Sequence, residues 1–202
     1  MKSENYDKSL QKIIDENIKK GVRPTMLLHS CCAPCSSACI ERLKEGFDLT
    51  VYYYNPNIDT DEEYELRAKE QKRLCETLGI KTVSEEHRSA EFYAAASGFE
   101  NEPEGGKRCE KCFALRLKKT AEYAKEKGLD CFATTLTVSP LKNAALINAI
   151  GEKAAEEKGI KYIPSDFKKR NGYLRSIELS KVYSLYRQNY CGCVYSKNKN
   201  PV

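Results

Sequence analysis

The sequence predicts an α/β fold, a mostly parallel sheet with helices on both faces. Short apolar or β-branched segments alternate with amphipathic segments of helical length, which is typical of βαβ units. Glycines and turn residues separate these segments, and no internal repeat or low-complexity linker interrupts them. A length of 202 residues allows one compact domain with a short appendage.

The first expected element is a leading helix at residues 4–20. Its apolar residues Leu10, Ile13, Ile14 and Ile18 recur at helical spacing, and Gly21 ends the pattern. We expect this leading helix (1–22) to pack on a single α/β domain (23–202) that ends in a helical, cysteine-containing tail.

The remaining elements follow in alternation. Strands are expected at residues 26–29, 49–54, 80–84, 131–136 and 160–163. Helices are expected from the CCAPC turn to about residue 46, and at 60–79, 89–97, 109–128, 143–159 and about 175–186. Thr60 with Glu63 forms a capping box at the start of one of them.

Three loops that follow strands hold Cys31 and Cys32, residues 55–59, and residues 139–143. Ligands of parallel sheets bind beyond the carboxyl ends of the strands. We therefore expect these loops to converge at one edge of the sheet and to form the site there.

Composition narrows the functional class. Hydrophobic residues make up 41% and charged residues 31%, which is typical of a globular protein, and no apolar run approaches the roughly 20 residues of a membrane span. The first 20 residues are charged throughout and lack the apolar stretch of a secretory signal, so we expect a cytoplasmic protein. A net charge of +5 permits an RNA partner without demonstrating one.

Ten cysteines in a reducing compartment favour metal or redox chemistry over disulfides. Cys31 and Cys32 follow the first strand close to a helix N-terminus, with Cys35 nearby, and such a position lowers thiol pKa and favours metal binding. The alternative is that one of them is a small buried hydrophobe. Neighbouring side chains on an extended backbone point in opposite directions, so the loop must bend for both to face one centre.

A second half-site lies at the start of a helix, where Cys109 and Cys112 form a C-x-x-C. This spacing suits zinc or an iron-sulfur cluster, with a thioredoxin-like redox pair as competitor. Spacing alone does not separate zinc from iron and sulfur. Four thiolates would saturate zinc, however, and would leave the Cys-Gly-Cys of the tail unexplained.

That tail pair, Cys191 and Cys193, can bend tightly at the glycine between them, so it can bind metal or form an easily reduced disulfide. The other three cysteines, Cys39, Cys75 and Cys131, occupy apolar positions within expected helices or strands. We interpret them as core residues.

A basic segment precedes the tail and is a candidate RNA-binding surface. Tyr173 offers a ring on which an unstacked base can lie, and the alternative is a solvated basic loop. The candidate RNA-binding residues are Lys168, Lys169, Arg170, Tyr173 and Arg175.

Four motifs in order, LLHSCCAPCS, RCEKCFALRLKKTAEYA, FATTLTVSPLKN and SDFKKRNGYLRS with YRQNYCGC, resemble the QueH-type epoxyqueuosine reductases over residues 26–196. The resemblance implies a cytoplasmic, cobalamin-independent oxidoreductase of queuosine biosynthesis. It would reduce epoxyqueuosine to queuosine at the wobble position of tRNA, with electrons from a donor of unknown identity. It also implies a nucleotide-binding fold related to the ATP-pyrophosphatase group.

The same resemblance implies site residues. Cys31, Cys32, Cys109 and Cys112 would hold a 4Fe-4S cluster, and Cys191 and Cys193 would be the redox-active pair. Some members carry an Asp where this chain has Cys35. For a second, mononuclear metal (iron or zinc), Cys35 is therefore the candidate ligand, with Cys191 or Cys193 as partner.

Two other functions compete. A zinc-stabilised RNA-binding module without catalysis would explain four thiolates. A nucleotide-dependent RNA thiolase or ligase would suit the fold, but CCAPC stands where such enzymes need a Gly-Ser-rich phosphate loop.

Overall fold

In the computed structural model, which describes residues 5–197, five parallel strands form one sheet in the order β3-β2-β1-β4-β5. The chain moves outward from β1 to β3, then returns to the other side of β1 with β4 and β5. The order therefore reverses between β1 and β4, and this is where ligands bind in such sheets. The strands are β1 (Thr25–His29), β2 (Asp48–Tyr53), β3 (Lys81–Ser84), β4 (Cys131–Thr134) and β5 (Lys161–Tyr162).

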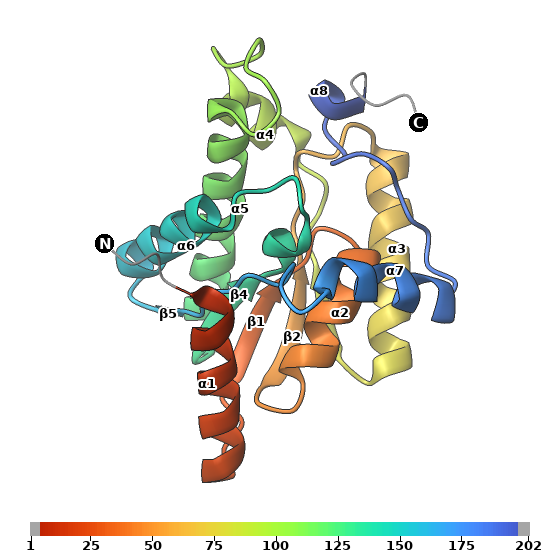
Figure 1. The fold of residues 1–202 in the computed structure, drawn as a ribbon. Coiled ribbons are helices and arrows are strands. Elements are labelled where there is room, and N and C mark those ends of the chain that lie inside the picture. Colours follow the sequence, from red (N-terminus) through yellow and green to blue (C-terminus); the bar gives the residue numbers. More distant parts are fainter. Residues whose placement is uncertain (1–4, 198–202) are drawn as a thin grey trace.

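Helices cover both faces of this sheet, with α5 and α6 on one side and α2, α3 and α7 on the other (Figure 1). The predicted three-layer α/β architecture is confirmed. The helices are α1 (Tyr6–Lys20), α2 (Ala33–Leu43), α3 (Asp61–Leu78), α4 (Ser89–Ala96), α5 (Lys107–Glu126), the 3-10 turn η1 (Thr135–Val138), α6 (Ala144–Lys158), α7 (Gly172–Val182) and α8 (Val194–Lys197).

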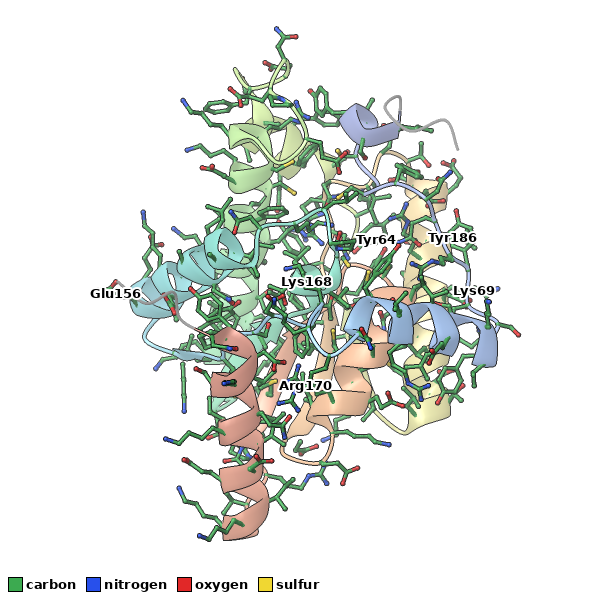
Figure 2. The ribbon with its side chains drawn as sticks, in the orientation of Figure 1. Tyr64, Lys69, Glu156, Lys168, Arg170 and Tyr186 are labelled. Carbon is green, nitrogen blue, oxygen red and sulfur yellow. The ribbon has the colours of Figure 1, made fainter. Side chains whose placement is uncertain are left out.

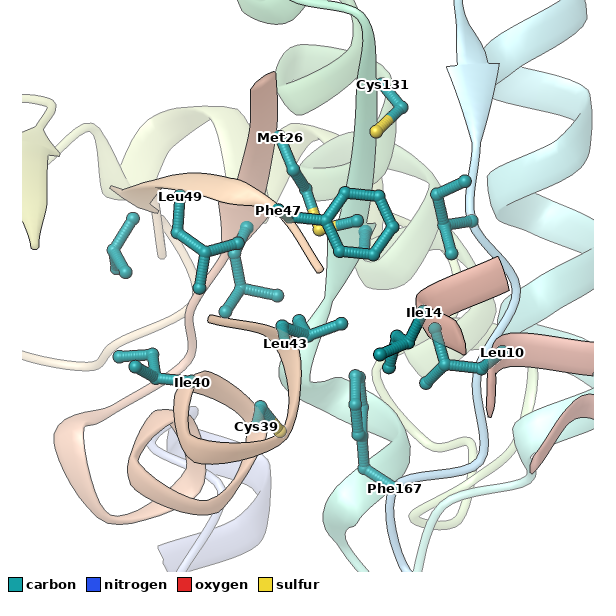
Figure 3. Close-up of a cluster of buried hydrophobic side chains, with 14 of the residues drawn as sticks. Leu10, Ile14, Met26, Cys39, Ile40, Leu43, Phe47, Leu49, Cys131 and Phe167 are labelled. Atoms are coloured by element: carbon teal, nitrogen blue, oxygen red, sulfur yellow. The ribbon is translucent and has the colours of Figure 1, made fainter. Parts of the chain in front are cut away.

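Alternation along β1 builds the two cores. Met26 and Leu28 pack on the face that α1, α2 and Phe167 cover, whereas Leu27 packs with side chains of α5 and α6 on the other face. Figure 3 shows Met26 in the first of these cores. Helix α1 contributes Leu10 and Ile14 to the first of these cores. The division into a leading helix (1–22) and an α/β domain (23–202) stays a prediction, although α1 packs directly on the body of the fold.

Predicted helix boundaries are explained by their caps. Thr60 Oγ1 accepts a hydrogen bond from the N–H of Glu63 at 3.2 Å, which is half of the expected capping box. At its other end α3 stops at Gly79, whose φ of +66° is a left-handed conformation that favours glycine. Among residues 5–197, no helix has the length and hydropathy needed to cross a membrane.

Two boundaries differ from the expectation. The expected strand at 131–136 ends at Thr134, because the Thr134 hydroxyl accepts a hydrogen bond from the N–H of Leu136 and turns the chain into η1. The expected helix at 175–186 begins earlier, at Gly172, where a Cβ atom would lie 1.8 Å from the carbonyl oxygen of Phe167. It ends before Ser184, which has a left-handed φ of 49°.

Candidate active site

Three cysteine sulfur atoms gather where β1 passes into α2. The Sγ atoms of Cys31, Cys32 and Cys35 lie within 4.8 Å of one another, and those of Cys31 and Cys32 are 3.9 Å apart. Cys32 precedes the helix in an extended conformation, and Cys35, one helical turn further, returns to the same side. The loop thus bends as required for adjacent cysteines to face one centre.

Neighbouring loops hold this turn in place. Asn55 Nδ2 donates a hydrogen bond to the carbonyl oxygen of Ser30 at 2.9 Å, and the N–H of Cys31 donates to Thr135 Oγ1 at 3.3 Å. The Oε1 atom of Gln71, on α3, accepts hydrogen bonds from the hydroxyls of Ser30 and Ser36 at 2.6 and 2.9 Å. The expected convergence of loops at the carboxyl edge of the sheet is confirmed.

Cys31 is the thiol of this group that ionises first. Hydrogen bonds from Cys32 and Cys35 hold the pKa of Cys31 well below its ordinary value, and the charges of Lys142 and Arg116 act in the same direction. The hydrogen bond to Cys31 raises the pKa of Cys32 to about 12, and the contacts with Cys31 and Cys32 raise that of Cys35. Cys31 is therefore the thiol of the three that loses its proton most readily, and metal binding would displace the protons of the others.

The C-x-x-C lies in the first two turns of α5. Cys109 is half-buried, and its Sγ accepts a hydrogen bond from the N–H of Gly105 at 3.2 Å. Cys112 is buried in a small cluster with Phe92 and Cys193. Burial raises the pKa of Cys112 to about 12. The C-x-x-C thus adjoins the tail, and its role as part of the ligand set stays a prediction.

A buried arginine outside the predicted site residues lies beside these thiols. Arg116, two turns along α5 from Cys109, is 1% exposed. Its Nε donates to Nε2 of His29 at 3.3 Å, its Nη1 lies 4.0 Å from Cys112 Sγ, and its Nη2 donates to Asn55 Oδ1. Burial and the Arg116 charge lower the pKa of His29 to about 3, so this imidazole is neutral. Arg116 lies within the motif RCEKCFALRLKKTAEYA, but the sequence pattern does not distinguish it from the other arginines.

The tail returns to the site along α3. Arg67 Nη1 donates to the carbonyl oxygen of Cys191 at 3.4 Å, and its guanidinium lies over the ring of Tyr190. The N–H of Asp59 donates to the carbonyl oxygen of Gly192 at 2.9 Å. A Cβ atom at Gly192 would lie 3.0 Å from Arg67, and the φ of Gly192 is +112°, so glycine is required here. Cys191 and Cys193 are therefore held against the body of the protein.

A cavity of about 430 Å³ opens onto these sulfur atoms. Cys31 and Cys35 lie on one wall, and Cys191 on the tail side. Lys142 also lines it; burial opposes ionisation of this amine, yet the nearby Cys191, Cys31 and Cys35 raise its pKa. The other lining residues are Glu104, Val138, Ser139, Leu141, Tyr173, Ser176, Arg187, Gln188, Asn189, Tyr190 and Ser196.

In the basic segment before the tail, three cations form ion pairs among the residues that the structure describes, whereas Lys169 and Tyr173 do not. Lys168 pairs with Asp166 at 2.8 Å, Arg170 pairs with Asp7 of α1 at 3.1 Å, and Arg175 pairs with Glu41 at 2.8 Å. Lys168 and Arg170 lie in the segment that leads into α7 (Figure 2). Lys169 is exposed. Tyr173 lines the cavity, with the guanidinium of Arg187 over its ring. The RNA-binding role of these residues stays a prediction.

The three remaining cysteines are core residues, as expected. Cys39 and Cys75 have no exposed surface, and Cys131 is 2% exposed. All three pack in the core on the α1 and α2 face of the sheet.

Comparison with known families supplies the identity. The family model described as Epoxyqueuosine reductase QueH matches residues 26–199. The chain belongs to this family. Curated epoxyqueuosine reductases that resemble it include that of Staphylococcus epidermidis, 44% identical over 98% of this chain and 87% of the relative. The epoxyqueuosine reductase of Thermotoga maritima is 37% identical over 85% of this chain and 90% of the relative.

Solved structures of other proteins share the fold of this epoxyqueuosine reductase family member. The U34-tRNA thiolase NcsA of Methanococcus maripaludis, solved with its 4Fe-4S cluster, is 15% identical with a TM-score of 0.55, over 96% of this chain and 69% of that one. The NMN synthetase of Francisella tularensis is 13% identical with a TM-score of 0.53, over 98% of this chain and 80% of that one. At such identities the likeness concerns the fold alone.

Proposed function

We propose that this chain reduces epoxyqueuosine to queuosine at the wobble position of tRNA by means of a 4Fe-4S cluster. One observation carries the proposal: cysteines from the β1 loop and the tail meet at one cavity, beside the C-x-x-C of α5, at the point where the strand order reverses. Family membership makes the chain an oxidoreductase of queuosine biosynthesis.

Cys31, Cys32, Cys109 and Cys112 are the proposed cluster ligands. The residues present fit such a group, because the site is rich in thiols and because the buried Arg116 beside Cys112 has no carboxylate partner within residues 5–197. A buried cation of this kind calls for an anion, which cluster thiolates provide. A second mononuclear metal, iron or zinc, is proposed at Cys35, with Cys191 or Cys193 as partner.

Removal of the epoxide oxygen consumes two electrons and two protons and leaves a C=C bond and water. When bound, the cluster supplies electrons one at a time. The chain's own groups receive the substrate and stabilise charge. Lys142, charged and facing the cavity, lies where an ammonium can donate a proton to an alkoxide that develops on the epoxide oxygen.

Other cavity residues orient the modified base. Gln188 Oε1 is buried and has no hydrogen-bond partner within the described part of the chain, so it is available to a hydroxyl or amine of a ligand. Tyr173 offers a ring for stacking of a splayed base. Cys191 and Cys193 are the proposed redox-active pair: Arg67 holds Cys191 at the cavity, and Cys193 packs against Cys112.

The proposed partners are a tRNA that carries epoxyqueuosine in its anticodon and an electron donor of unknown identity. Surface cations, Lys169 foremost, are proposed to bind the tRNA backbone, with Lys168, Arg170 and Arg175 beside them. The proposed location is the cytoplasm, which is where reduced thiols persist.

A second candidate, a zinc-stabilised RNA-binding module without catalysis, is favoured by one observation. Sulfur atoms within 4.8 Å of one another suit tetrahedral zinc, whose bonds to sulfur are about 2.3 Å long. Anaerobic purification with iron, zinc and acid-labile sulfide analysis, followed by incubation of reduced protein with epoxyqueuosine-tRNA, separates the two. Iron and sulfide with formation of queuosine support the reductase, whereas stoichiometric zinc with no turnover overturns it.

A further inference from the structure

We propose that Arg116 is the built-in counter-charge of the cysteine centre, a positioning residue that makes the site more favourable for added negative charge. The inference rests on the proposed cluster and concerns a residue that the motifs do not assign. Arg116 is 1% exposed and, within residues 5–197, forms no ion pair with a carboxylate.

The contacts of Arg116 are with uncharged groups. Its Nε lies 3.3 Å from Nε2 of His29, a ring whose Nδ1 lies 2.9 Å from Thr134 Oγ1. Its Nη2 donates to the side-chain oxygen of Asn55. Neutral acceptors satisfy hydrogen bonds but do not neutralise a buried charge, whose transfer from water costs several kcal/mol.

Other buried or partly buried arginines are satisfied differently. Arg67 pairs with Glu63 and Arg42 pairs with Asp7, at 2.6 and 2.7 Å. Arg108 donates to the carbonyl oxygens of residues 99, 100 and 102, and so closes the loop before α5. Arg116 faces the Sγ of Cys112 instead, and its charge also acts on Cys31. The thiolates of the centre are the anions that this cation meets.

Two physical consequences follow. A fixed positive charge in a medium of low dielectric stabilises the more negative of two redox states, so Arg116 raises the reduction potential of a centre beside it. The charge also has opposite effects on stability with and without its anion. It adds an attraction when the anionic centre is assembled and leaves an uncompensated buried cation when the centre is stripped.

The test uses the full chain after anaerobic reconstitution with iron and sulfide. Arg116→Gln and Arg116→Met remove the charge, Arg116→Lys retains it, and Arg42→Gln is the control that breaks an ion pair elsewhere. We measure the midpoint potential by spectroelectrochemistry and the thermal unfolding of loaded and stripped protein. A more negative potential in the Gln and Met variants, with Arg116→Lys and Arg42→Gln near wild type, is expected.

The unfolding data separate a counter-charge from a packing role. We expect Arg116→Met to lower the Tm of loaded protein and to leave that of stripped protein unchanged or higher. An unchanged potential, or an equal loss of Tm in both forms, overturns the inference. If wild-type protein assembles no cluster, the proposed function fails. The counter-charge is then tested separately, by comparing the Tm of wild-type and Arg116→Met protein with and without zinc. The inference stands only if the substitution lowers Tm with zinc and not without it.

Discussion

Removal of the Arg67 charge should release the tail that carries Cys191 and Cys193. The Arg67 side chain is 2% exposed, and its Nε and Nη2 both contact Oε1 of Glu63, at 2.7 and 2.6 Å. The same guanidinium reaches the carbonyl oxygen of Cys191. Arg67→Gln therefore breaks a buried ion pair and the contact that fixes the tail in one step.

The size of the effect can be worked from these contacts. Loss of one partner of a buried pair costs about 3–5 kcal/mol, and the lower end applies because the hydroxyl of Tyr186 still donates to Glu63. For a chain of this length, a loss of about 3 kcal/mol lowers Tm by roughly 6–12 °C. Figure 2 shows Tyr186 beside α3, the helix that carries Glu63.

Hydrogen exchange reports on the tail directly. The amide of Asp59 is protected by its bond to Gly192, so Arg67→Gln should exchange this amide faster while the amides of β1 keep their protection. Turnover should fall, with iron content retained. Lys72→Gln is the matched control on α3, because its ion pair with Glu76 is exposed at both side chains and is worth less than about 1 kcal/mol. Unchanged Tm and unchanged exchange at Asp59 in Arg67→Gln would refute the conclusion that Arg67 holds the tail in place.

Two further predictions concern the metal and the RNA. Cys109→Ser and Cys112→Ser should each lose the cluster, measured as iron per chain, and with it turnover. Cys75→Ser should keep both, because Cys75 lies in the core and a serine oxygen can replace its Sγ as acceptor of the hydrogen bond from Gln71. Full iron in either of the first two variants excludes that residue as a ligand. Lys169→Glu should weaken tRNA binding and make its salt dependence shallower. Tyr173→Ala should instead cost roughly 1–3 kcal/mol of affinity with little change in that slope, as titrations at several salt concentrations would show.

Much of the fold follows from local patterns in the sequence. Glycines that end helices, the Thr60 cap and the alternation in β1 each act over a few residues, so the pattern reveals them without knowledge of the partners. Cys31 and Cys32 were placed at the sheet edge because a loop after a parallel strand has only that location. The start of α7 was missed because it depends on the approach of Phe167 to Gly172, a contact between turns that carries no periodic signal.

The candidate site was less predictable because its members depend on tertiary contacts. Arg116 reads as an ordinary arginine on an amphipathic helix, and only its burial against His29 and Asn55 makes it distinctive. Gln71 similarly fixes Ser30 from the middle of α3. In the basic segment, by contrast, the sequence suggests equal roles for residues that the structure places in different contacts. Its cations look alike in sequence and both Lys169 and Arg170 are exposed, yet Arg170 is tied to α1 by Asp7, whereas Lys169 forms no ion pair within residues 5–197.

The arrangement also explains how one general fold can serve a thiol-based reaction. A doubly wound sheet offers the end of β1 and the N-terminus of α2 as a ligand site whatever the ligand is, and the fold alone does not choose the chemistry. Here Cys31, Cys32 and Cys35 occupy that position, so the positive end of the helix meets sulfur. Loops fixed by the sheet supply these sulfur atoms rigidly. Cys191, by contrast, comes from a tail that is held by Arg67 of α3 and, through Gly192, by Asp59 in the loop before α3.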